Sequence, residues 1–362
     1  MQGAGRLGLH MPPTTVHFNG GVNLPDTETV MREIAARVPA GVRRIPDGET
    51  GSRQNWIFFQ LEKFWQTPGL EQAGVMDTPS EGYEQMPKVR LSDGVEPADV
   101  RWADLGYADV YQDSYATFRR LRDEGVIPSS VRFQVQYPTP LASINGWVVP
   151  EDQDRLEPSY ESALFADLDR LLAALPPDEV AVQWDVAVEF AILEGGFEGT
   201  AAQTLDGIVE RLVRCVDHVP DAVPVGLHLC YGDYQHQHFK QPESLDLQVR
   251  VSNAVVAASG RTVNWLAYTV PQNRSDAAFF EPLRDLNVSP ETELYFALVP
   301  YHPAEQEPGT VDAQVQLVDS HLPSAEWGIC TECGMARAER DDVPVLLDLH
   351  REIIATGGSR TP

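Results

Sequence analysis

Short apolar runs alternate with longer amphipathic stretches along most of the chain. β-Branched and aromatic residues dominate the short runs, which is typical of buried strands. The longer stretches repeat apolar residues every three or four positions, as a helix with one buried face does. Strands are predicted at residues 14–19, 42–46, 131–137, 179–186, 223–229, 262–270, 294–299 and 326–329. Helices are predicted at residues 54–65, 109–122, 159–175, 204–219, 244–258, 276–286, 310–322 and 343–355.

The order of these elements predicts a parallel sheet, because parallel neighbours need a crossover connection, which a helix usually supplies. Eight such units in 362 residues favour a closed barrel over an open doubly wound sheet, since no glycine-rich dinucleotide-binding turn is present. The expected fold class is therefore α/β, a (β/α)8 TIM barrel. Residues 1–362 are expected to form a single domain.

The second strand–helix unit of the predicted barrel is much longer than the others. About 80 residues separate the second predicted strand from the third, and residues 67–106 contain four prolines and several acidic residues. A loop that follows a barrel strand lies at the C-terminal face, where active sites form. This long insertion after the second strand is a candidate lid, with a decorative insertion as the alternative. Residues 356–362 are predicted to be a flexible tail.

Charge narrows the choice of partners. The chain has 54 acidic and 27 basic residues, a formal net charge of −27, which repels phosphate backbones and anionic membrane surfaces. Neither nucleic acid nor a membrane is expected as a partner. No apolar run reaches the roughly 18 residues of a spanning helix, and the N-terminus lacks the apolar core of an export signal. Four cysteines are too few for a disulfide framework, so a cytoplasmic location is expected.

Three residues have the chemistry and placement of a metal site. His228 and Cys230 stand two positions apart at the end of the fifth predicted strand, so their side chains share a face. Cys333 follows the eighth strand, and in a barrel all strand ends converge on one mouth. Nitrogen and thiolate ligands suit Zn²⁺, and three of them leave one position for a substrate. The sequence predicts a zinc site, with purely structural roles as the alternative.

The order His228-x-Cys230 followed by Cys333-Gly334 resembles the C-terminal catalytic domain of cobalamin-independent methionine synthase. That domain belongs to a wider group that includes uroporphyrinogen decarboxylase-like barrels. The resemblance implies a Zn²⁺ cofactor that activates a small-molecule thiol for alkylation by a methyl or alkyl donor. In the family, the thiol is homocysteine and the donor is a methylated folate. A homo-oligomer is compatible with these features.

The resemblance also implies residues that act on the substrate. Gln183-Trp184-Asp185 resembles a strand segment whose aspartate holds the substrate amino group, which maps to Asp185. Trp184 and the nearby Glu189 would contribute to the same substrate contact. Tyr301-His302-Pro303 resembles a histidine motif and implies that His302 is a proton donor.

Two further segments are implied to contact the substrate. Asp47-Gly48-Glu49 resembles a Gly-Glu motif, so Glu49 would be a second contact of the amino group. Gly20 and Gly21 stand where the family has a Gly-Ser pair that binds the substrate carboxylate, which leaves a backbone contact there. Capping of the following helices is the alternative role for Glu49 and Asp185.

The sequence departs from the family at the fourth zinc ligand. The family has a glutamate just ahead of an Arg-Ser-Asp triplet, and that position falls at or near Pro271 here. Either the metal has three protein ligands, or Cys330 or Glu332 takes the place, or the metal is absent. His236 and His238 could also supply a ligand, with a solvated loop as the alternative.

Three functions therefore stay open at this stage. The first is a zinc-dependent methyl or alkyl transferase, in which the ion lowers the pKa of a small thiol. The second is a lyase that uses the same ion as a Lewis acid to cleave a C–S or C–C bond. The third is a metal-free binding protein on the same barrel, which the missing glutamate keeps open. The charge of −27 also disfavours a polyanionic folate tail.

Overall fold

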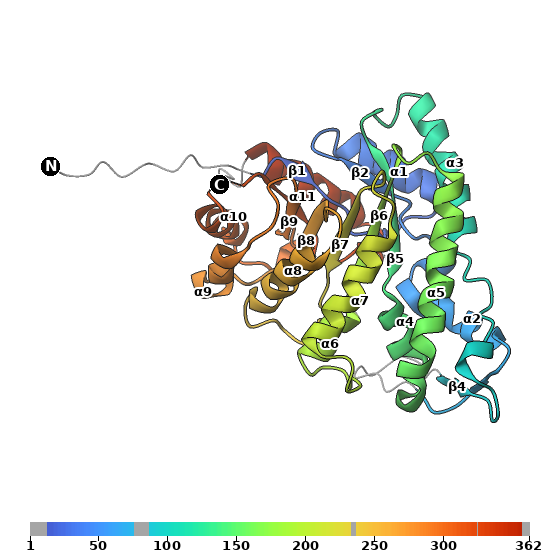
Figure 1. The fold of residues 1–362 in the computed structure, drawn as a ribbon. Coiled ribbons are helices and arrows are strands. Elements are labelled where there is room, and N and C mark those ends of the chain that lie inside the picture. Colours follow the sequence, from blue (N-terminus) through green and yellow to red (C-terminus); the bar gives the residue numbers. More distant parts are fainter. Residues whose placement is uncertain (1–12, 76–86, 233–236, 324, 357–362) are drawn as a thin grey trace.

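Eight parallel strands form one curled sheet in the part of the chain that the computed structural model describes, residues 13–75, 87–232, 237–323 and 325–356. Figure 1 shows these strands in the middle of the molecule with helices around them. The order in the sheet is β1 (Thr15–Val16), β10 (Trp327–Cys330), β9 (Glu293–Ala297), β8 (Trp265–Tyr268), β7 (Val225–Leu229), β6 (Val180–Val186), β5 (Arg132–Pro138) and β2 (Arg44–Pro46).

The two edge strands of this sheet meet at a single point. Val16 of β1 forms an isolated parallel bridge with Val42, two residues before β2, and its N–H donates to the carbonyl of Gly41 at 2.9 Å. Among the described residues, this bridge takes the place of a continuous ladder between β1 and β2. The predicted α/β fold with eight parallel strands is confirmed as a curled sheet whose strand order is that of the expected barrel.

Helices follow the strands and cover the outer face of the sheet. Several begin at a side chain that caps the first turn: Asp26, Thr139, Thr204 and Asp276 each accept a backbone N–H there. The helices are α1 (Thr27–Arg37), α2 (Gln60–Gln66), α3 (Tyr107–Asp123), α4 (Pro140–Trp147), α5 (Pro150–Ala174), α6 (Val188–Leu193), α7 (Leu205–His218), α8 (Asp246–Ala258), α9 (Ala277–Phe280), α10 (Thr310–His321) and α11 (Val343–Thr356). Of these helices, none combines the length and the hydropathy that crossing a bilayer requires.

Helix α5 begins earlier than the sequence predicts. The expected start lies just after Pro158, but the helix extends back to Pro150 and holds Pro158 in its interior. Proline removes one helical N–H donor, which disfavours this position. The helix continues because Leu156, Tyr160 and Leu164 keep the same buried face on both sides of the proline.

The insertion after β2 contains a small antiparallel hairpin, β3 (Leu70–Gln72) and β4 (Val89–Leu91). It packs beside α4 and α5, where the N–H of Leu91 donates to Asp152 Oδ2 at 2.9 Å and Lys88 Nζ donates to the carbonyl of Asn145 at 2.9 Å. Residues 76–86 of the insertion and 357–362 of the tail lie outside the described residues, whereas Thr356 ends α11. A lid role for the insertion stays a prediction.

The two faces of the strands differ in chemistry. On β6, Trp184 points to the helices, with its ring 5.9 Å from that of Phe165 on α5. Gln183 and Asp185, one position to either side, point into the interior of the curled sheet and hydrogen-bond to each other at 2.9 Å. The interior therefore carries a buried polar network, while the outer face of the sheet forms an apolar core with the helices.

Candidate metal centre

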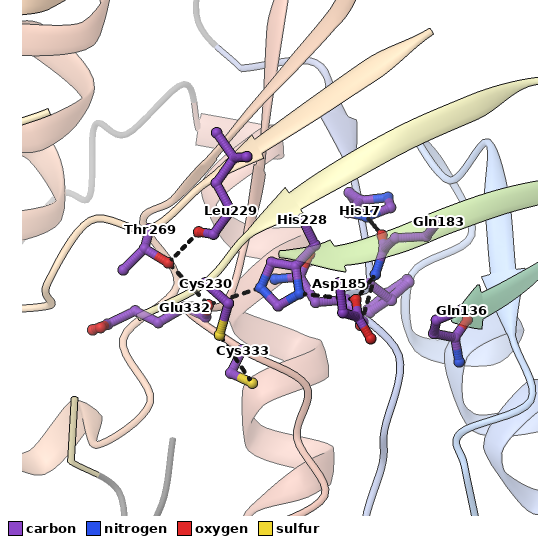
Figure 2. A network of polar contacts seen from close by, with 12 residues as sticks. His17, Gln136, Gln183, Asp185, His228, Leu229, Cys230, Thr269, Glu332 and Cys333 are labelled. Atoms are coloured by element: carbon purple, nitrogen blue, oxygen red, sulfur yellow. Dashed lines mark hydrogen bonds and ion pairs between the residues drawn. The ribbon is translucent and has the colours of Figure 1, made fainter. Parts of the chain in front are cut away.

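The structure brings together His228, Cys230 and Cys333, the three residues predicted to bind zinc. Their candidate ligand atoms all lie within 4.8 Å of one another (Figure 2). His228 is on β7, and Cys230 is the first residue after that strand, so alternation places both side chains on one face. Cys333 lies three residues beyond the end of β10. The cluster therefore joins segments 103 residues apart.

The spacing of the sulfur atoms fits a zinc ion. The Sγ atoms of Cys230 and Cys333 are 3.8 Å apart, and neither cysteine forms a disulfide in the described part of the chain. Two thiolates, each about 2.3 Å from a tetrahedral Zn²⁺, lie about 3.8 Å from one another. A disulfide would instead bring the sulfurs to about 2.05 Å. With the imidazole nitrogen, the donor set is one nitrogen and two sulfurs, and one tetrahedral position remains for another ligand.

Both ring nitrogens of His228 face oxygen atoms. Nδ1 lies 3.3 Å from Asp185 Oδ1, and Nε2 lies 3.2 Å from the carbonyl oxygen of Glu332. Burial by itself lowers the pKa of His228, but the Asp185 carboxylate, the Cys333 thiolate and the Glu332 carbonyl outweigh it and raise this pKa. The negative surroundings suit a cation, but a metal would have to replace a ring proton, because a histidine ligand binds through a deprotonated nitrogen.

Neither candidate for a fourth protein ligand reaches the cluster. Glu332 Oε1 accepts the backbone N–H of Gln272 at 2.7 Å, and Oε2 pairs with His238 Nε2 at 2.5 Å. Cys330 is buried in β10, where burial raises the pKa of its thiol. His238 is engaged with Glu332, and His236 lies outside the described residues. Within those residues, the candidate zinc site therefore has three protein ligands.

A pair of acidic residues lies beside the cluster. Burial, followed by the negative charge of Asp185, raises the pKa of Glu49 to about 8. Glu49 follows β2 with a left-handed φ of 47°, and its N–H donates to Asp47 Oδ1 at 3.0 Å. Asp47 in turn binds Arg53 and accepts the hydroxyl of Ser114 at 2.9 Å. The loop thus holds Glu49 where the negative charge of Asp185 acts on it, and a cationic ligand would relieve this repulsion.

Gly20 and Gly21 lie next to this pair in closely packed backbone. Gly20 has a φ of 131°, and a Cβ there would lie 2.9 Å from Gln136 Cγ. A Cβ on Gly21 would lie 2.7 Å from the Cβ of Ala336 and 3.3 Å from Glu49 Oε2. Both positions therefore require glycine, and their backbone contact with a substrate stays a prediction.

Three other predicted site residues make contacts outside the ligand cluster. Trp184 is on the helix-facing side of β6, with its ring 5.9 Å from that of Tyr137. The Glu189 carboxylate accepts the hydroxyl of Thr139, and burial raises its pKa to about 7. His302 follows β9, and its N–H donates to Gln272 Oε1 at 2.9 Å. Their substrate and proton-transfer roles stay predictions.

Sequence reasoning missed two glutamines that organise the site. Gln272 binds both the Glu332 carboxylate and the backbone of His302, which connects the loops after β8, β9 and β10. Gln183 donates to Asp185 Oδ1 from the neighbouring interior position of β6. The i, i+2 spacing of Gln183 and Asp185 was a signal for their shared face, whereas nothing local in the sequence indicated the partners of Gln272.

Known structures resemble this fold. A B12-independent methionine synthase from Shewanella sp. W3-18-1, determined with selenomethionine, is 13% identical and has a TM-score of 0.59, over 96% of this chain and 97% of that chain. A protein from Listeria monocytogenes, assigned as a vitamin-B12-independent methionine synthase, is 12% identical with a TM-score of 0.53, over 90% and 86% of the two chains. Neither protein families nor curated proteins gave a sequence match. The fold is thus similar to that of B12-independent methionine synthases, in line with the resemblance found in the sequence.

Proposed function

We propose that this protein is a zinc-dependent methyl or alkyl transferase that acts on a small thiol. The observation that carries the proposal is the arrangement of His228, Cys230 and Cys333, with the two sulfurs 3.8 Å apart. A site with three protein ligands and one open position is typical of catalytic zinc, whereas structural zinc sites are closed by four protein ligands.

The residues of the site have separate tasks in this proposal. When bound, zinc lowers the pKa of an incoming thiol and keeps it as the nucleophilic thiolate near neutral pH. His228, Cys230 and Cys333 would hold the ion. Asp185 and Glu49 would orient a cationic group of the thiol substrate. The sulfur forms a bond to the alkyl carbon as the bond from that carbon to the donor breaks, and His302 would protonate the leaving group.

Two further points support the proposal. The Shewanella protein of similar fold was determined with selenomethionine, an amino acid that carries a methylated selenium atom. An amino acid of this kind has both a chalcogen for the metal and an ammonium group for the carboxylate pair.

The bridge between Val16 and Val42 also supports closure of the curled sheet into a complete barrel. Closure is part of the proposal because it brings the C-terminal strand ends to one mouth.

Metal analysis of the purified chain tests this function. We expect about one zinc per chain in the wild type, and its loss in both His228→Ala and Cys333→Ser. Cys215→Ser is the matched control, because Cys215 is a free cysteine buried in α7, outside the cluster. No bound zinc under chelator-free conditions would contradict the proposal and favour a metal-free binding protein. A screen of thiols with methyl donors then tests the reaction, and fragments of a single substrate would indicate a lyase.

A further inference from the structure

A chain of buried hydrogen bonds connects His17 to His228, a residue of the candidate metal centre. His17, directly after β1, contacts Gln183 Oε1 through its Nε2 at 2.7 Å. Gln183 Nε2 donates to the carbonyl of Asn19 at 3.0 Å and to Asp185 Oδ1 at 2.9 Å. The same Oδ1 lies 3.3 Å from His228 Nδ1 (Figure 2). Side chains from three strand segments are thus connected in one line.

The chemistry of the groups sets the direction of each hydrogen bond. Two acceptors, the Asn19 carbonyl and the Asp185 carboxylate, face the same end of the Gln183 amide, so that end must be the NH₂ group. The other end is then the amide oxygen, which requires His17 Nε2 to carry a proton. Burial and the nearby Arg44 lower the pKa of His17, which keeps this ring neutral.

The same reasoning extends to the metal ligand. A carboxylate only accepts, so His228 Nδ1 carries the proton that points to Asp185. The Glu332 carbonyl, 3.2 Å from Nε2, also only accepts, so without a metal Nε2 carries a proton too. A metal would displace the proton on Nε2, because Asp185 holds the one on Nδ1, and in Figure 2 Nε2 lies on the side of the ring toward the two cysteines. Histidine ligands usually donate their second N–H to a carboxylate or carbonyl, which fixes both the tautomer and the ring orientation.

We infer that Gln183 and His17 are positioning residues for the metal ligand His228, acting through Asp185. The inference rests on the proposed function, since it requires a metal at the cluster. Neither residue belongs to the cluster itself. Gln183 has no exposed surface, and His17 is 1% exposed, so water does not compete for these hydrogen bonds.

Gln183→Met tests the inference, because methionine fills a similar volume but cannot hold the Asp185 carboxylate. The matched control is Gln134→Met. Gln134 is also fully buried, and its amide donates to the carbonyl of Phe18 at 2.8 Å, but it lies toward Gln136 rather than Asp185. Zinc affinity is measured by competition with a colorimetric chelator. We expect Gln183→Met to weaken zinc binding about 10- to 100-fold, and Gln134→Met to change it by less than about threefold.

A double-mutant cycle separates positioning from general destabilisation of the interior. If Gln183 acts through Asp185, Gln183→Met lowers zinc affinity far less in an Asp185→Ala background than in the wild type. Additive effects would contradict the inference, as would equal losses in Gln183→Met and Gln134→Met. Thermal unfolding of the metal-free variants shows whether they fold, and His17→Phe replaces Gln183→Met if that variant does not.

The outcomes also distinguish this inference from the proposed function. If the wild type binds no zinc, both are overturned. If the wild type binds zinc and Gln183→Met binds it equally well, the inference alone is overturned.

Discussion

Glu332 Oε1 accepts a hydrogen bond from the backbone N–H of Gln272 at 2.7 Å, immediately after Pro271. Pro271 is at or near the position where the resembled family carries its metal-ligating glutamate. The segment around Pro271 therefore has no carboxylate of its own, but the Glu332 carboxylate, from the loop after β10, hydrogen-bonds to it. This carboxylate is bound to Gln272 and, through Oε2, to His238, and it is not one of the three ligand groups of the candidate metal centre.

Glu332→Gln is expected to retain the zinc of the wild type. The glutamine side-chain oxygen can still accept the N–H of Gln272, and the residue's backbone carbonyl still faces His228. Zinc content after gel filtration, compared with that of Cys333→Ser, checks the prediction. Loss of zinc from Glu332→Gln would show that this carboxylate binds the metal.

Chemical modification is expected to be faster at Cys333, in the ligand cluster, than at the two cysteines buried in the core. Cys333 is half-buried, whereas Cys215 and Cys330 are buried and burial raises the pKa of both thiols. After chelation, iodoacetamide should modify Cys333 at least about tenfold faster than either buried cysteine, because the thiolate is the reactive form. Peptide mapping by mass spectrometry measures the rates. Added zinc should slow the reaction at Cys333, and no protection by zinc would count against its role as a ligand.

Arg44 is expected to contribute strongly to stability from the opposite side of the interior. Its guanidinium lies 4.1 Å from the ring centroid of Trp265 and pairs with Glu293 at 2.5 Å. Because Arg44 is 5% exposed, Arg44→Met should lower the free energy of unfolding by about 3 kcal/mol.

Arg43→Met is the control for this prediction, since Arg43 pairs with the same Glu293 but its side chain is 49% exposed. It should cost less than about 1 kcal/mol. Urea unfolding measures both variants, and equal losses would show that burial of Arg44 adds nothing.

Glu189 is expected to make stability depend on pH. Burial raises its pKa from 4.5 to about 7, so between these values the folded state keeps a proton that the unfolded state releases. Stability therefore falls as pH rises through this window, by on the order of 3 kcal/mol for this group. Glu189→Gln should remove this contribution to the decrease in stability, because glutamine does not titrate.

Urea unfolding at pH 5 and pH 8 tests this effect, with the exposed Glu96→Gln as the control variant. The free energy of unfolding of Glu189→Gln should exceed that of the wild type by more at pH 8 than at pH 5. A gain that is the same at both pH values would contradict the raised pKa.

The sequence alone determined the strand order and the ligand set of the candidate metal centre. Periodicity is a local property, so it identified the strands and placed His228 and Cys230 on one face. Parallel strands then bring their C-terminal ends together, which allowed Cys333 to be joined to them across 103 residues. The interior position of Pro158 in α5 was not predictable in this way, because contacts of a buried helix face override the local preference of proline.

Only the tertiary structure decided which side chains surround the candidate centre. Alternation along β6 places Trp184 and Asp185 on opposite faces, but only the packed structure shows that Asp185 meets His228. The carboxylate of Glu332 turns to Gln272, and Gln183 meets a histidine 166 residues away. These contacts depend on how distant segments pack around buried polar atoms, which must find hydrogen-bond partners wherever the fold provides them. Local sequence patterns carry no information about those partners.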